Sequence, residues 1–141
     1  MSKPPKPDNE EQRLAALRSF DILDSEPERA FDDLVRIAAG ICGVPMAAGT
    51  LVARDRQWFK AQVGMESPDP SLETSFCAHT VLDPGAATVV SDATRDRRFA
   101  DNPLVNAANG IRFYAGAPLV TQEGFALGAL CVVGDQPHGL A

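Results

Sequence analysis

Apolar residues recur at helical spacing in two stretches near the start of the chain. Leu14 and Leu17 lie three apart among strong helix formers, which predicts a helix from about Asn9 to Ser19. A break is predicted at residues 21–24. Beyond it the apolar positions again recur every three or four residues, over residues 31–42. The chain is therefore expected to open with two helices.

Capping residues mark the ends of the second predicted helix. Ser25 and Glu28 have the three-residue spacing of a capping box, and Pro27 would sit in the first turn. Gly43 and Pro45 predict that the helix ends after residue 42.

From residue 46 onward the apolar pattern changes to the alternation and short apolar runs of strands. The predicted strands are residues 46–52, 57–63, 87–90, 113–120 and 125–133. Ser75 and Asn102 are expected to begin short helices between them. Gly116 and Gly128 lie inside strands, where a glycine indicates close approach of another backbone or a ligand. Hairpin-linked strands predict an α+β fold with a mainly antiparallel sheet.

Composition and charge narrow the possible functions. The net charge of −6 argues against a nucleic-acid-binding face, because phosphate binding needs clustered Lys and Arg. The first residues lack the apolar core of a signal peptide, and no apolar run approaches the roughly 20 residues of a membrane span. We expect a cytoplasmic domain over residues 9–136, with a disordered leader at 1–8 and a short tail at 137–141.

Eight sequence blocks lie in order along the chain, at residues 13–17, 20–24, 31–34, 56–60, 75–80, 102–105, 112–119 and 128–132. Their ordered succession resembles bacterial GAF domains of the type found in sensor histidine kinases and diguanylate cyclases. The resemblance implies a six-stranded antiparallel sheet with the terminal helices on one face. It also implies a ligand pocket under loops and short helices on the other face. Helices entering such domains often form a dimer seam, and Leu14 with Leu17 could form one or pack on the sheet.

The resemblance implies a sensory module that binds an unidentified small molecule, forms a homodimer and controls an output domain in cis or in trans. That output domain would be one such as a histidine kinase, a diguanylate cyclase or a similar module. An interaction-only domain with a vestigial pocket is one alternative. A free methionine sulfoxide reductase-like enzyme is another. The domain itself is expected not to be an enzyme, with no catalytic or metal-binding residues, and the sequence identifies no cofactor.

Eight residues are candidates for the pocket lining, and each also has a purely structural interpretation. Arg112 and Tyr114 share one face of a predicted strand and could meet a polar ligand. Alternatively, Arg112 could pair with a carboxylate such as that of Asp92. The candidates are Trp58, Phe76, Cys77, His79, Asp92, Phe99, Arg112 and Tyr114.

The three cysteines are expected to be inert. A reductase of this fold needs two cysteines close together, whereas Cys42, Cys77 and Cys131 are well separated along the chain, each in an apolar run. Buried thiols have raised pKa values and react slowly. An odd number without close pairs also argues against a disulfide framework.

Overall fold

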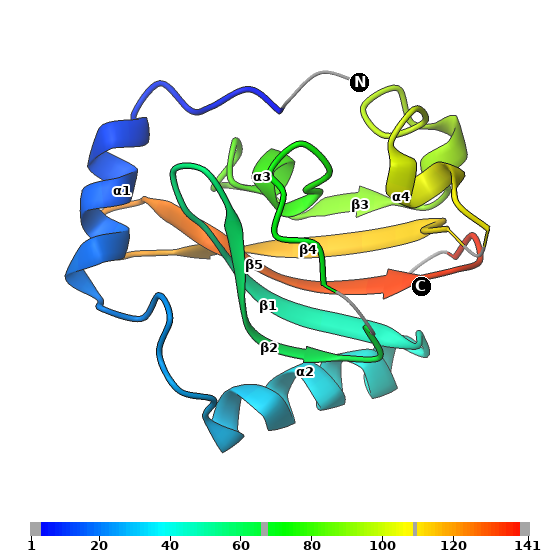
Figure 1. Cartoon of the computed structure of the whole chain (residues 1–141), viewed down its shortest axis with the longest axis horizontal. Coiled ribbons are helices and arrows are strands. Elements are labelled where there is room, and N and C mark those ends of the chain that lie inside the picture. Colours follow the sequence, from blue (N-terminus) through cyan, green and yellow to red (C-terminus); the bar gives the residue numbers. More distant parts are fainter. Residues whose placement is uncertain (1–3, 66–67, 109, 139–141) are drawn as a thin grey trace.

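A five-stranded antiparallel sheet forms the centre of the protein (Figure 1). The computed structural model describes residues 4–65, 68–108 and 110–138. The strands are β1 (Met46–Val52), β2 (Gln57–Val63), β3 (Thr88–Val90), β4 (Phe113–Val120) and β5 (Ala126–Gly134), in the spatial order β2-β1-β5-β4-β3. The helices are α1 (Glu10–Ser19), α2 (Arg29–Cys42), α3 (Cys77–Thr80) and α4 (Pro103–Asn106), with a 3-10 turn, η1, at Ala93–Arg95.

The strand pattern of the sequence matches the observed strands closely. β1, β2 and β4 begin and end at the predicted residues, β3 is one residue shorter, and β5 lies one residue further along. The sixth strand that the family resemblance implies is absent from the described residues. Between β2 and β4, prolines and glycines such as Pro68, Pro70, Pro84 and Gly85 keep most of the chain in loops and short turns.

Helix α2 covers one face of the sheet, and α1 stands at one end of the sheet (Figure 1). Val35 and Ala39 of α2 pack against Ala47, Phe113 and other side chains of this face. Leu17 of α1 packs beside Leu51. The apolar stripe of α1 is therefore buried in the chain's own core, with Leu14 3% and Leu17 1% exposed. Of the two roles left open for this stripe, the structure shows packing on the sheet.

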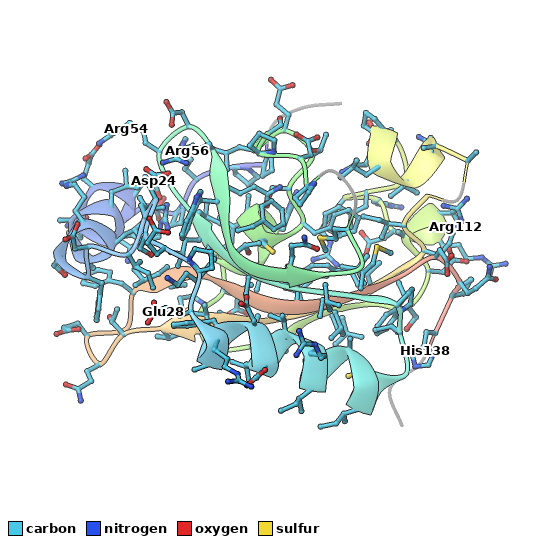
Figure 2. All side chains as sticks on the ribbon, turned by 60° about the horizontal axis from the view of Figure 1, so that its bottom comes forward. Asp24, Glu28, Arg54, Arg56, Arg112 and His138 are labelled. Atoms are coloured by element: carbon cyan, nitrogen blue, oxygen red, sulfur yellow. The ribbon has the colours of Figure 1, made fainter. Side chains whose placement is uncertain are left out.

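The start of α2 differs from the prediction, because Lys60 of β2 holds the preceding segment in an extended form. The Lys60 ammonium lies 2.6 Å from the Glu28 carboxylate and donates to the Ser25 hydroxyl (2.8 Å) and the Glu26 carbonyl (2.6 Å). Ser25 therefore does not cap the helix, which begins at Arg29 (Figure 2 labels Glu28 at this end). The end of α2 is as predicted, with Gly43 in the left-handed conformation.

One side of α2 presents apolar side chains to solvent. These are Phe31, Leu34, Ile37 and Ile41, which we call the α2 stripe, with exposures of 36%, 46%, 57% and 80%. Their spacing of three or four residues places them along one line of the helix. Among the described residues, no helix is long and apolar enough to cross a membrane.

The opposite face of the sheet is covered by α3, η1, α4 and the loops that join them. Phe76 stacks on Phe99 with ring centroids 4.0 Å apart, and both belong to the larger apolar cluster of this face. Of the two strand glycines, Gly128 permits the predicted close approach of another backbone, because a Cβ there would overlap the Thr50 carbonyl. At Gly116 the close group is a side chain instead, since a Cβ would overlap the Tyr114 hydroxyl.

The described part of the expected leader, residues 4–8, forms neither helix nor strand but lies against the domain. The Lys6 ammonium donates to the Arg54 carbonyl (2.6 Å) and lies 3.7 Å from the Glu10 carboxylate. Residues 1–3 of the leader and 139–141 of the tail lie outside the described residues.

Candidate ligand pocket

A cavity of about 320 Å³ lies between the sheet and the loop that follows β2. Its size falls within the range of small-molecule sites. Strands β1, β2, β4 and β5 supply one side, and the loop after β2, α3 and the segment around α4 supply the other. The lining residues are Met46, Thr50, Gln57, Phe59, Gly64, Met65, Pro68, Asp69, Thr74, Phe76, Cys77, Leu104, Ile111, Tyr114, Cys131 and Val133.

A chain of buried polar groups crosses the sheet side of this cavity. The Tyr114 hydroxyl lies 2.8 Å from the Thr80 hydroxyl and donates to the Cys77 sulfur at 3.3 Å. The Cys77 and Cys131 sulfurs are 3.9 Å apart. Helix α3 and strands β4 and β5 thus bring together groups that lie far apart in the sequence.

Gln57 ties down the loop that covers the cavity. Its side-chain amide donates to the Asp69 carbonyl (2.6 Å), and its side-chain oxygen accepts from the Ser75 hydroxyl (2.8 Å). Ser75 in turn accepts from the Ala78 amide (3.0 Å), although it does not occupy the predicted N-cap position, because α3 begins at Cys77 and Phe76 is its N-cap. Asn102 caps α4 and also donates to the Thr74 carbonyl (3.2 Å). The cover is therefore fixed to the sheet by hydrogen bonds from buried side chains.

The two thiols of the cavity differ in acidity. The pKa of Cys77 is lowered to about 7, mainly by hydrogen bonding from Cys131 and to a smaller extent by bonds from Thr50 and Tyr114, against the opposing effect of burial. The same contact and burial raise the pKa of Cys131 well above its usual value. Burial also raises the pKa of Tyr114, so its hydroxyl remains protonated and available as a donor.

The expectation that the cysteines are well separated is wrong for one pair. Cys77 and Cys131 are 54 residues apart in sequence, but α3 lies over β5 and brings their sulfurs into contact. Only Cys42, at the end of α2 on the other face, is remote from both. In the sequence, both cysteines lie in apolar runs, which indicates that they are buried. It does not indicate which apolar runs pack against each other.

Three of the eight predicted pocket residues line the cavity, namely Phe76, Cys77 and Tyr114. Their part in binding remains a prediction. The cavity is also lined by residues that were not among the predicted ones, including Thr50, Gln57, Phe59 and Cys131. The alternation of strand side chains could have indicated Phe59, because its neighbour Trp58 turns to the helix face and packs in the cluster of Leu17.

His79 and Phe99 lie next to the cavity's wall rather than in its lining. Phe99 backs Phe76, and the His79 ring meets Phe99 edge-on with centroids 4.8 Å apart. His79 lines a separate hollow with Arg98. Burial, assisted by the Arg98 charge, lowers the pKa of His79, whereas Asp96 partly opposes this shift.

Arg112 does not make the predicted ion pair with Asp92. It lies just before β4, at the end of the sheet opposite α1, and donates to the carbonyls of Val105 (2.6 Å) and Ile111 (3.1 Å) (Figure 2). Asp92 caps η1 by accepting from Thr94 and lies 3.8 Å from Arg95. The carbonyls around α4 are nearer to the guanidinium, which secures α4 to the strand.

Charge is scarce in the cavity. Asp69 is the one Asp, Glu, Lys, Arg or His among the described lining residues, and its carboxylate already accepts from the Ser71 amide (2.9 Å) and the Thr74 hydroxyl (2.8 Å). Within the described ranges, no three His, Cys, Asp or Glu side chains gather closely enough to hold a metal ion. The cavity is suited to a mainly apolar molecule that can accept or donate a few hydrogen bonds.

Comparison with known proteins places the chain in a family. The model of the GAF domain matches residues 26–140. The chain is 39% identical over 139 residues to the cyclic di-GMP phosphodiesterase PA2567 of Pseudomonas aeruginosa; the match covers 99% of this chain but only 24% of that protein.

Two solved structures show the same fold at low identity. The GAF domain of an Acinetobacter phosphoenolpyruvate-protein phosphotransferase is 18% identical with a TM-score of 0.61, and the match covers 92% of this chain and 81% of that chain. The free methionine-R-sulfoxide reductase of Neisseria meningitidis, solved with its substrate, is 15% identical with a TM-score of 0.62, over 93% and 76% of the two chains. The chain therefore belongs to the GAF domain family.

Proposed function

We propose that this GAF domain is a regulatory module that binds a small, mainly apolar molecule without catalysing a reaction of its own. The observation that carries the proposal is the cavity, with its tethered cover and its buried hydrogen-bonding groups at Thr50, Gln57 and Tyr114. A preformed concave site with a few fixed polar groups is the usual form of a small-molecule site.

The charge of the lining favours an uncharged or cationic ligand. Phosphate groups are recognised by Arg, Lys or helix N-termini, and no Arg, Lys or His belongs to the described part of the lining. Asp69 would repel an anion. Cyclic di-GMP, the compound named for the phosphodiesterase relative, therefore suits this cavity poorly, and we infer that the domain's ligand differs from that compound.

The regulated activity would reside in another domain, in cis or in trans. The chain spans about a quarter of the curated relative it matches, so that relative contains much more than this domain. Its name favours an output that acts on cyclic di-GMP. A histidine kinase or a diguanylate cyclase, as the sequence resemblance implies, is the alternative output.

We further propose that the domain forms a homodimer through the α2 stripe and not through α1. Leu14 and Leu17 of α1 are buried within the chain, whereas Ile37 and Ile41 of α2 are exposed. Asp33 and Arg36 beside the stripe pair with each other at 3.3 Å within the chain, and across a two-fold axis each would pair with its counterpart in the second copy. One helix side falls short of the roughly 800 Å² per partner of a stable interface, so we expect a weak dimer.

A ligand screen by thermal shift tests the binding proposal, with two Ile→Trp variants as a matched pair. Ile111→Trp fills the cavity, whereas Ile41→Trp adds the same bulk on the exposed side of α2. A ligand at a hundred times its Kd stabilises by about 2.7 kcal/mol. We expect this stabilisation in the wild type and in Ile41→Trp, and its loss in Ile111→Trp. Equal stabilisation of all three would place the ligand elsewhere. No stabilisation by any uncharged, cationic or anionic compound would favour the interaction-only alternative.

Light scattering over a range of concentrations tests the dimer. Ile37→Glu places a charge in the α2 stripe, and we expect it to shift association to at least tenfold higher concentration. Val89→Glu changes a side chain of similar exposure on β3 and serves as the control. If both variants associate like the wild type, the α2 stripe is not the interface.

The structure meets one requirement of the reductase alternative but not another. Cys77 and Cys131 are close enough to act together. However, the carboxylate of free methionine sulfoxide would find no cationic side chain among the described lining residues. We therefore expect no turnover of free methionine sulfoxide in the presence of a dithiol reductant. Measurable turnover that Cys77→Ser abolishes would establish the enzyme instead.

A further inference from the structure

We propose that Cys77 and Cys131 form a thiol–disulfide site in the cavity, which a hydroperoxide oxidises reversibly. The two sulfurs are already in contact at 3.9 Å, and both residues line the cavity. This site does not depend on the identity of the ligand or on the proposed regulatory function.

Formation of the bond requires the two sulfurs to move closer together. A disulfide requires the sulfurs to be about 2.0 Å apart, so the pair must close by about 2 Å. Cys131 belongs to β5, which is held between β1 and β4. Cys77 begins the four-residue helix α3, which is flanked by loops on both sides. A small shift of α3, or a rotation of the Cys77 side chain, can provide the approach while the strand stays fixed.

The two cysteines have different parts in the reaction. Hydrogen bonds from Cys131, Thr50 and Tyr114 stabilise a thiolate at Cys77, whose pKa is about 7, and Cys131 keeps its proton. The thiolate is the nucleophilic form of cysteine. Cys77 is therefore the attacking residue, and Cys131 resolves the intermediate.

The chemistry balances with one hydroperoxide. The Cys77 sulfur attacks the hydroperoxide, a sulfur–oxygen bond forms, the oxygen–oxygen bond breaks, and the departing oxygen takes a proton to leave as alcohol or water. The Cys131 sulfur then attacks the Cys77 sulfenic acid, a sulfur–sulfur bond forms, and water leaves with the Cys131 proton. Two thiols lose two electrons and two protons overall, and the peroxide gains them. A small dithiol reverses the oxidation by exchange.

Oxidation would change the cavity itself. The disulfide converts the Cys77 sulfur, which accepts from the Tyr114 hydroxyl, into a neutral and weaker acceptor, and it draws α3 toward β5. Phe76 immediately precedes Cys77 and lines the same cavity. The reduced and oxidised forms therefore present different walls to any molecule that enters.

Thiol counting on the complete chain tests the proposal without altering the pair. The chain has three cysteines, of which Cys42 is remote from the other two. After brief exposure to hydrogen peroxide and denaturation, we expect three maleimide-reactive thiols to fall to one, and dithiothreitol to restore three. Peptide mapping should join the peptides of Cys77 and Cys131. In Cys42→Ser, the count should fall from two to none. The rate of loss should rise as the pH passes through about 7, where Cys77 ionises.

Single substitutions assign the two roles. In Cys131→Ser, oxidation should stop at a Cys77 sulfenic acid that dimedone traps, and in Cys77→Ser, the Cys131 thiol should persist. Circular dichroism verifies that each variant folds. If either variant does not fold, the thiol count in Cys42→Ser, which keeps both Cys77 and Cys131, tests the proposal instead. Retention of both thiols in Cys42→Ser, disulfides only between chains, or a sulfenic acid beside a free Cys131 in the wild type would each overturn the proposal.

Discussion

The two faces of the sheet are buried by different means, although the same strands supply both. On the helix face, Ala47 and Leu51 of β1 meet the apolar side chains of α1 and α2. On the cavity face, Thr50 of the same strand contributes to a site that contains Tyr114, two thiols and an open volume. The helix face therefore provides close packing, whereas the cavity face keeps space and polar groups. We infer that stability depends more on the first face and ligand binding more on the second.

The largest loss of stability is expected when a buried side chain on the helix face is shortened. Leu17→Ala leaves a void among Leu51, Ala53 and Leu127, all buried, and should lower the free energy of unfolding by about 3 kcal/mol, as measured by urea denaturation. Leu34→Ala, the same substitution on the half-exposed side of α2, is the control and should cost less than about 1 kcal/mol. Equal losses would mean that the α2 stripe is as well packed as the core.

A smaller loss of stability is expected from a substitution on the cavity face. Tyr114→Phe removes the hydroxyl that contacts Thr80 and Cys77 but keeps the ring, so the free energy of unfolding should fall by about 1 kcal/mol. The pKa of Cys77 should rise, because one hydrogen bond to its thiolate is lost. Titration of alkylation rate against pH measures this rise. A loss as large as that of Leu17→Ala would contradict the division between the two faces.

A pH-dependent effect should arise beside the cavity from His79. Burial lowers the pKa of His79 in the folded chain below its usual 6.5, so folding favours the neutral ring. Its contribution to stability is present above pH 6.5 and is lost as the pH falls through the lowered folded pKa. The wild type should therefore lose more stability between about pH 7.5 and about pH 5.5 than His79→Gln does. Identical pH profiles from urea denaturation would show that His79 does not contribute.

The smallest effect is expected at the surface, away from both packed faces. Arg54 forms a two-pronged ion pair with Glu11 at 2.8 and 2.9 Å, but both side chains are mainly exposed (Figure 2 labels Arg54). Arg54→Gln should change the urea midpoint only at low salt, because water and ions screen such pairs. The pKa of Glu11, which Arg54 lowers, should return toward 4.5 in this variant, as NMR titration would detect. A salt-independent loss would mean that Arg54 packs as well as pairs.

Local chemistry explains which predictions from sequence are confirmed. The alternation of apolar residues defines the bounds of β1, β2 and β4, and the Asn102 side-chain oxygen caps α4 by accepting from the Leu104 amide. Each of these confirmed predictions depends only on residues within one turn or one strand. Ser25 shows the limit of such reasoning. It has the right spacing for a cap, but Lys60, 35 residues away, binds its hydroxyl.

The sequence by itself determined the family, the class of fold and most element boundaries, because periodicity, capping residues and turn residues act over short distances. Only the tertiary structure decided which residues meet across those elements. It turned Trp58 to the helix face and Phe59 to the cavity, and it joined Cys77 to Cys131 across 54 residues. Such contacts depend on how helices and strands pack, and no pattern within a single element contains that information.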